Sequence, residues 1–176
     1  MDNRLRLYFF DKSGTLLKTT NDSGYRAFDY DGTLDRVVAL RQTNQQGPTW
    51  ADYYDIHGNK LDSLMITSGY VNRLRYSGNG KYLFYTEDDK STIELIDLHG
   101  TRMFSKSGKG EIYCSPSGKL FGAILNRFQV GDNWYSKGAI WNLKGELVDS
   151  FTIAIHVDEF NFQVRNEAMT DKLQNQ

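Results

Sequence analysis

The sequence predicts an all-β fold of antiparallel four-stranded units, and three observations support this prediction. A short turn motif recurs five times along the 176 residues. The segments between the turns are rich in β-branched and aromatic residues, and the chain contains only two prolines that could interrupt a strand. No segment before residue 166 shows a convincing helical periodicity of apolar residues. We therefore expect one domain of strands joined by tight turns.

The recurring turn motif consists of an aromatic or aliphatic residue, then Asp or Asn, two variable residues and Gly. Its copies are Phe10–Gly14, Phe28–Gly32, Tyr54–Gly58, Ile96–Gly100 and Trp141–Gly145. The Asp or Asn side chain can bond the backbone that follows it, and Gly accepts a positive φ. The motif therefore predicts a hairpin turn between two strands at each copy.

A second series of turns alternates with the first, at Tyr76–Leu83 and Cys114–Phe121, where a small polar residue and Gly precede an apolar run. Together the two series define a unit of four strands. The spacing from Asp55 to Asp97 is 42 residues, and the spacing from Asp97 to Asn142 is 45 residues. A repeat of this length with four strands is that of a β-propeller blade. The sequence therefore predicts antiparallel four-stranded blades that form a propeller or a partial propeller.

Three full blades are expected, at residues 21–66, 67–106 and 107–154, within a single repeat domain that covers residues 1–165. The first should contain the strands Tyr25–Asp29, Arg36–Arg41, Trp50–Ile56 and Lys60–Ile66. The second should contain Val71–Ser77, Tyr82–Glu87, Thr92–Leu98 and Thr101–Ser105. The third should contain Glu111–Ser115, Leu120–Arg127, Lys137–Leu143 and Glu146–Ala154. Thr92–Leu98 is apolar on both faces, as expected for a strand packed between two sheets.

Both ends of the repeat array are expected to be incomplete. Residues 4–20 should form a half-blade, residues 155–165 a partial blade with one strand, and residues 166–176 a polar tail. The ring could close as a monomer with a composite fourth blade, as a symmetric homodimer of about seven or eight blades, or within a longer propeller. Four-bladed rings are the tightest, and the tail is too polar to be a missing strand. The sequence therefore favours the homodimer or the longer propeller.

Two turns carry a resemblance to a known family. Ser115–Lys119 reads SPSGK and Ser77–Lys81 reads SGNGK. Both resemble the turn that joins the first two strands in WD-repeat-like β-propeller blades, and the resemblance extends over nearly the whole chain. The Gly-His and Trp-Asp pairs of typical WD repeats are absent. The resemblance therefore implies a propeller architecture and assigns no subfamily.

Composition argues against several function classes. The formal net charge is −1 and the pI is about 6.3, so neither nucleic acid nor an anionic membrane is an expected partner. The single cysteine, Cys114, excludes an internal disulfide and is expected to be a buried thiol. We expect no metal and no cofactor. If Met1 is the natural start, the lack of an apolar signal core in Met1–Phe10 predicts a cytoplasmic protein.

One segment favours an alternative function. Ala27–Leu34 resembles the first motif of haloacid dehalogenase-like, Mg²⁺-dependent phosphatases, in which Asp29 would be the nucleophile and Asp31 the acid/base. The same carboxylates with Asp35 could instead hold Ca²⁺, although isolated acidic turns are usually solvated. However, Gly-Thr-Leu recurs at Gly14–Leu16 within another copy of the turn motif. The phosphatase fold also needs helices between parallel strands, so a turn role for both aspartates is the preferred interpretation.

The binding surface is expected on the face that carries the loops between second and third strands, because variable loops on a regular scaffold usually carry recognition. These loops are Gln42–Thr49, Glu87–Ser91 and Phe128–Ser136. The predicted binding residues are Trp50, Asp88, Asp89, Arg127, Asp132, Trp134 and Tyr135. In the alternative, the tryptophans fold back as lids of their own blades.

The sequence thus predicts a non-enzymatic scaffold that binds a protein or peptide. A propeller enzyme or a sugar-binding module, with a site spread over several blades, is a further alternative.

Overall fold

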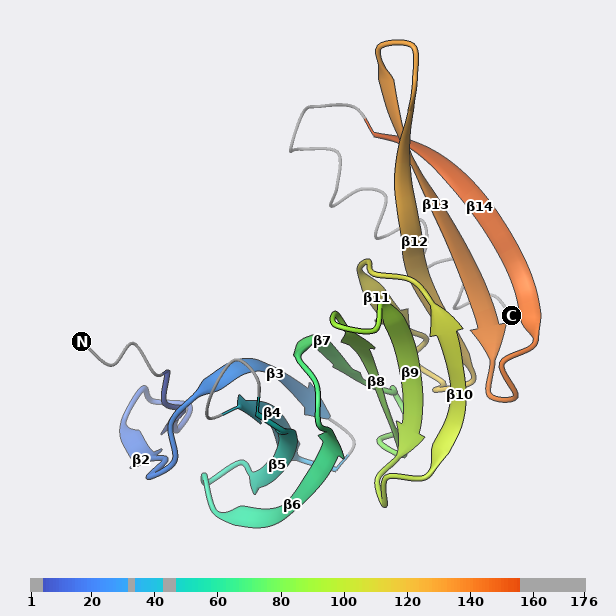
Figure 1. Cartoon of the computed structure of the whole chain (residues 1–176). Helices are drawn as coiled ribbons and strands as arrows, with labels where there is room; N and C mark the ends of the chain where they lie inside the picture. The colour runs from blue at the N-terminus through green and yellow to red at the C-terminus, as the bar shows by residue number, and fades with distance from the viewer. Residues whose placement is uncertain (1–4, 32–33, 43–46, 156–176) are drawn as a thin grey trace.

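The computed structural model describes residues 5–31, 34–42 and 47–155, and in these ranges the chain contains strands and turns with no helix (Figure 1). The strands form three four-stranded antiparallel sheets and one two-stranded sheet. Within each four-stranded sheet the spatial order follows the chain order, so each sheet is a meander of three hairpins. These observations confirm the predicted all-β class of antiparallel four-stranded blades.

The blades are named here in chain order. The half-blade contains β1 (Tyr8–Phe10) and β2 (Leu16–Thr19). Blade 1 contains β3 (Tyr25–Asp31), β4 (Arg36–Gln42), β5 (Thr49–Asp55) and β6 (Lys60–Thr67). Blade 2 contains β7 (Val71–Tyr76), β8 (Tyr82–Glu87), β9 (Thr92–Asp97) and β10 (Arg102–Ser107). Blade 3 contains β11 (Ile112–Cys114), β12 (Leu120–Val130), β13 (Asn133–Asn142) and β14 (Leu147–Ile155). Apart from Ile155, the expected partial blade and the polar tail lie outside the described residues.

The sheets are arranged as a fan. Figure 1 shows them as successive sectors in chain order, with the half-blade at one end and blade 3 at the other. The first strands of the blades, β3, β7 and β11, are neighbours in space. Over the described residues the array is a partial propeller. No helix in this part of the chain is long and apolar enough to cross a membrane.

The recurring motif forms hairpin turns, as the sequence predicts. In blade 1 the Asp55 Oδ1 accepts hydrogen bonds from the backbone N–H groups of His57 and Asn59, at 2.9 and 2.8 Å. Asp97 makes the same two bonds in blade 2. Gly58 has a φ of 79°, which favours glycine over any residue with a Cβ. The motif therefore ends one strand and starts the next through local bonds alone.

These turns also set the distance between neighbouring units. A Cβ at Gly58 would lie 2.6 Å from the ring of Phe9 in the half-blade. A Cβ at Gly100 would lie 3.3 Å from Leu64 in blade 1. Each turn therefore packs on the unit before it, and the absence of a side chain at the glycine permits the close contact.

The core lies between the sheets in three clusters. Between the half-blade and blade 1 it contains Phe9, Tyr25, Ala39 and Tyr54. Between blades 1 and 2 it contains Val38, Leu40, Ala51, Tyr53, Val71, Leu74, Tyr76, Leu83, Tyr85 and Ile96. Between blades 2 and 3 it contains Phe84, Ile93, Leu95, Phe104, Ile112, Phe121, Ala123, Ala139 and Trp141. Blade 2 thus buries one face against blade 1 and the other against blade 3.

Candidate functional site

A long hairpin replaces the expected loop of blade 3. The sequence predicts a loop over Phe128–Ser136, but β12 and β13 continue through it, with Phe128 paired to Tyr135. The hairpin closes on Gly131, which has a φ of 58°, and Asp132. The loop prediction is therefore wrong. The segment is polar because the hairpin extends beyond the blades, where neither face must be apolar (Figure 1).

The strand geometry separates two residues that the sequence placed together. Successive side chains of a strand point to opposite faces. Tyr135 stacks on Phe128, with ring centroids 5.6 Å apart and an interplanar angle of 20°. Trp134 lies on the other face, which it shares with Arg127 according to the strand register. Trp134 and Tyr135 therefore cannot form a single anchor.

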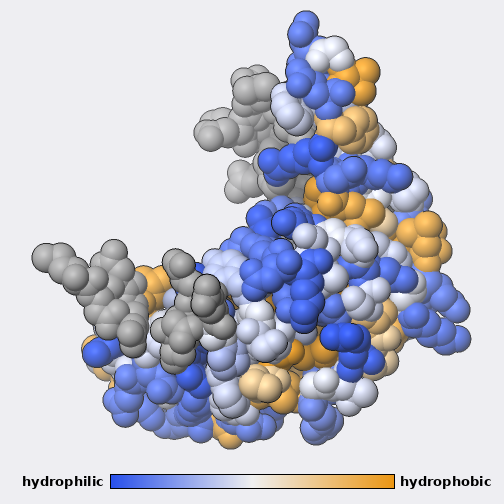
Figure 2. Space-filling view, viewed as in Figure 1, coloured by the Kyte–Doolittle hydropathy of each residue, from blue (hydrophilic) through white to orange (hydrophobic). Residues whose placement is uncertain are grey.

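The tip of the hairpin exposes apolar surface. Trp134 is 44% exposed and Val130 is 59% exposed. Arg127 and Asp132 are also exposed. Figure 2 shows hydrophobic and hydrophilic residues together on this projecting part. The alternative in which the tryptophan folds back as a lid of its own blade thus does not apply to Trp134.

Trp50 packs within its own blade. Its side chain is half-buried at the start of β5. The guanidinium of Arg41 lies 5.7 Å from the centroid of its ring, within range of a cation–π interaction. Arg41 in turn bonds the buried Asp52, with 2.6 Å from Nε to Oδ2. Trp50 therefore covers a charged group of blade 1.

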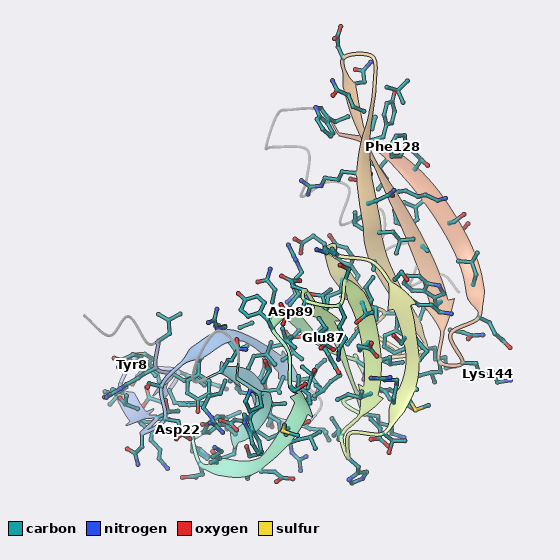
Figure 3. All side chains as sticks on the ribbon, viewed as in Figure 1. Tyr8, Asp22, Glu87, Asp89, Phe128 and Lys144 are labelled. Carbon is teal, nitrogen blue, oxygen red and sulfur yellow. The ribbon has the colours of Figure 1, made fainter. Side chains whose placement is uncertain are left out.

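Asp88 and Asp89 fix the connection between blades 1 and 2. The Asp89 carboxylate accepts the N–H of Tyr70 at 2.8 Å, and the Asp88 N–H donates to the carbonyl of Tyr70 at 2.9 Å. Next to them, the buried Glu87 accepts the Thr67 hydroxyl at 2.9 Å. The Asp89 carboxylate therefore has a structural role, whereas Asp88 contributes to this connection through its backbone. Figure 3 shows Asp89 and Glu87 at the junction of these blades and Phe128 on the hairpin.

The seven predicted residues thus form three separate groups, in blade 1, at the junction of blades 1 and 2, and on the hairpin. Of these groups, the hairpin carries the exposed aromatic side chain.

The sequence reasoning missed a buried ionic cluster in blade 1. Asp52 on β5 accepts hydrogen bonds from Arg41, from the Tyr25 hydroxyl at 3.1 Å and from Ser63, and it pairs with Lys60 at 3.1 Å. Burial alone would raise the pKa of Asp52, but the bonds from Arg41, Ser63 and Lys60 outweigh it and lower the pKa below its ordinary value. Every member of the cluster is held by another, so the cluster serves the fold.

Blade 2 repeats this cluster 42 residues later. Glu94 accepts the Ser105 hydroxyl at 2.7 Å and pairs with Arg102 at 3.0 Å. Glu94, Arg102 and Ser105 follow Asp52, Lys60 and Ser63 at one constant spacing. That spacing is the signal from which the sequence could have revealed the cluster.

A small cavity lies along the first strands of the blades. Its volume is about 110 Å³, and its lining includes Phe28, Asn72, Arg73, Arg75 and Glu111. Arg73 and Glu111 form an ion pair across it at 3.0 Å. Because this pair neutralises one of the two cations, the cavity has no strong preference for an anion.

The structure does not support the phosphatase alternative. The Asp29 Oδ2 accepts the backbone N–H of Tyr76 at 2.7 Å, and its Oδ1 accepts the N–H of Tyr30 at 3.0 Å. Asp29 therefore links blades 1 and 2. The ranges that the structure describes contain neither the helices of that fold nor a group of three His, Cys, Asp or Glu side chains that could hold a metal ion.

Comparison with known proteins identifies the fold. No family model and no curated protein matches the sequence. Among solved structures, the Kuenenia stuttgartiensis hydrazine synthase matches with a TM-score of 0.61 and 16% identity, over 84% of this chain and 43% of that one. The Neurospora crassa Pan2 WD40 domain matches with a TM-score of 0.56 and 14% identity. The match covers 82% of this chain and 46% of that one. A chain of a mitotic checkpoint complex matches with a TM-score of 0.58 and 14% identity. The match covers 80% of this chain and 44% of that one.

These likenesses, at such low identities, show the fold alone. The chain consists of WD-repeat-like β-propeller blades, as the sequence predicts. It spans less than half the length of each of these three structures.

Proposed function

We propose that this chain is a non-enzymatic propeller scaffold that binds a protein or peptide through the face carrying the β12–β13 hairpin. The observation that carries the proposal is the exposure of Trp134 on a hairpin that extends beyond the blades. Tryptophan is enriched among the residues that dominate binding energy at protein interfaces. An exposed tryptophan on a projecting hairpin gives a partner an apolar contact that the fold does not need.

The hairpin is held in place, which favours binding. β13 pairs with β12 on one side and with β14 on the other, and the second pairing continues up to Trp134 opposite Ile155. On the opposite face, the stacked rings of Phe128 and Tyr135 stiffen the two strands. A rigid platform loses little conformational entropy when a partner binds. Trp134, with Arg127 beside it, is therefore the proposed anchor.

The test compares Trp134→Ala with the unaltered chain. Proteins captured from a lysate of the source cells by the immobilised chain are identified, and the affinity of the chief one is then measured by calorimetry. We expect Trp134→Ala to weaken binding by about 2 kcal/mol, roughly a 30-fold rise in Kd. The melting temperature should change little, because Trp134 belongs to none of the three core clusters.

Leu61→Ala is the matched control, since Leu61 is half-exposed on β6, outside the hairpin. It should leave the affinity unchanged. Equal affinity for the Trp134→Ala variant and the unaltered chain would refute the proposed face. A large loss of stability on replacing Trp134 would show that the ring supports the fold instead.

A further inference from the structure

The β12–β13 hairpin has an inner face, which is turned toward blade 2. Successive side chains of a strand alternate between its two faces, so Tyr135, Lys137 and Ala139 of β13 share one face. Ala139 packs in the core between blades 2 and 3, which identifies this face as the one that blade 2 covers nearer the base of the sheet. Phe128 belongs to the same face, because it pairs with Tyr135 and stacks on its ring. Beyond the core, the inner face therefore carries Phe128, Tyr135 and Lys137.

The connection between blades 2 and 3 lies at the foot of the inner face. The Gly108 N–H of this connection donates to the carbonyl of Ser91, in the loop between β8 and β9, at 2.9 Å. A Cβ at Gly108 would lie 3.1 Å from Leu125 of β12. The next residue along the chain, Lys109, is exposed. Because the hairpin continues beyond the ends of β8 and β9, its inner face and this connection meet in a corner (Figure 1).

The corner is basic. Lys109 and Lys137 are both exposed, and neither forms an ion pair with a carboxylate of the residues that the structure describes. Lys137 lies two residues from Tyr135 on the same strand face, so its charge is close to the stacked rings. The corner thus combines a half-buried aromatic pair with two cations.

The acidic residues around the corner do not neutralise these cations. Two of them are held in ion pairs, Glu87 with Lys90 at 2.7 Å and Glu111 with Arg73 at 3.0 Å. Three lie elsewhere, with Asp88 at the connection between blades 1 and 2, Asp132 at the closing turn of the hairpin and Asp149 on the other face of the sheet. The fold therefore leaves the positive charge of the corner available to a partner.

We propose that this corner binds an acidic, extended segment of a partner protein. An apolar side chain of the segment packs on Phe128 and Tyr135, and its carboxylates lie against Lys109 and Lys137. Complementary charge across an interface selects the partner and speeds association. The net charge of −1 gives the whole chain no attraction to nucleic acid, which favours a protein segment. This surface lies on the opposite side of the hairpin from Trp134, so it is separate from the anchor proposed above.

The first test is an NMR titration of the isotope-labelled chain with the acetylated and amidated peptide Glu-Glu-Trp-Glu-Glu as the probe. We expect shifts of the amide signals of Phe128, Tyr135, Lys137 and Lys109 at up to about 1 mM probe. The peptide Lys-Lys-Trp-Lys-Lys should cause none of them. Equal shifts with the basic peptide, tighter binding of oligothymidylate, or no shifts at all overturn the proposal. Shifts confined to the surroundings of Trp134 also overturn it, but they leave the proposed function standing.

The second test changes the corner itself. Lys137→Glu should raise the Kd of the acidic probe about fivefold or more at low salt, because it reverses a charge that faces the carboxylates. Lys137→Arg should retain the affinity. Lys12→Glu is the matched control at an exposed lysine of the half-blade and should leave the Kd unchanged. Tyr135→Ala should weaken binding with an unchanged far-UV circular dichroism spectrum. An equal Kd for Lys137→Glu and Lys12→Glu overturns the proposal.

Discussion

Blades 1 and 2 each bury a carboxylate on the third strand, whereas blade 3 has Ala139 at the same position. Asp52 lies opposite Ser63 in the ladder, Glu94 opposite Ser105, and Ala139 opposite a further serine of β14. The cation of the first two blades is also replaced, by a leucine of β14. Blade 3 therefore has neither the carboxylate nor the cation of the cluster, although it keeps the serine.

The neighbouring blade explains the difference. Phe104 of blade 2 faces blade 3, and its ring centroid lies 6.2 Å from those of Phe121 and Trp141. The corresponding position in blade 1 is Asp62, which is exposed. Where the preceding blade supplies a large ring, the small Ala139 makes room for it. The interfaces between successive blades thus have the same strand register, but aromatic rings occupy one interface where an ion pair occupies another.

The largest expected effect comes from removing a ring of the aromatic interface. Phe121 is fully buried and contacts Tyr82, Phe84 and Phe104 through its ring. Phe121→Ala should lower the free energy of unfolding by about 4 kcal/mol, because it leaves a cavity among rigid rings. Guanidinium denaturation measures this. Phe128→Ala on the hairpin is the control, and an equal loss there would contradict the assigned core.

A somewhat smaller loss is expected at the ionic cluster. Asp52→Ala should cost about 3 kcal/mol, since it removes the carboxylate partner of Arg41, leaves Lys60 paired with Asp22 alone and takes one acceptor from the buried Tyr25 hydroxyl. Asp62→Ala, on the exposed side of β6, should change stability by less than about 0.5 kcal/mol. Similar denaturation midpoints for the two variants would show that the cluster adds nothing to stability.

The smallest effect is a change in the pH dependence of stability. The folded pKa of Asp52 lies below its ordinary value, so its contribution is complete above about pH 4 and is lost as the pH falls through the folded pKa. In the Asp52→Asn variant the free energy of unfolding should therefore fall less steeply as the pH is lowered. The slope should differ from that of the unaltered chain by at most about 1.4 kcal/mol per pH unit, because one group binds one proton. Denaturation from pH 6 to pH 2 measures the slopes. An unaltered slope would mean that Asp52 titrates alike in both states.

Local chemistry made the blade architecture predictable. The turn aspartates bond the residues directly after them, as Asp55 does, so a five-residue window contains the whole cause of each turn. Each repeat contains one turn from each of the two series, and each turn joins two strands. The two turns together therefore define the four strands of a blade. The predicted strands of blades 1 and 2 differ from the observed ones by one or two residues, because strand ends depend on neighbouring units.

The candidate site was less predictable, because its residues depend on pairing between distant segments. Asp89 accepts the N–H of Tyr70, which lies 19 residues earlier in the connection between blades 1 and 2, and no local pattern reveals this bond. Reading residues 128–136 as a loop also concealed the alternation that separates Trp134 from Tyr135. The buried Asp52 was the exception, since its 42-residue spacing from Glu94 was visible in the sequence.

The contact of each turn glycine with the unit before it has a consequence for cooperativity. The atoms nearest to a Cβ at Gly58 belong to the half-blade, and those nearest to a Cβ at Gly100 belong to blade 1. Coupling in the described array therefore runs from neighbour to neighbour, as in a one-dimensional chain of repeats. Opening of an end unit removes one set of contacts and leaves the next interface intact. A blade is then stabilised mainly by its direct neighbours. A blade at one end of the array can therefore unfold while the central blades stay folded.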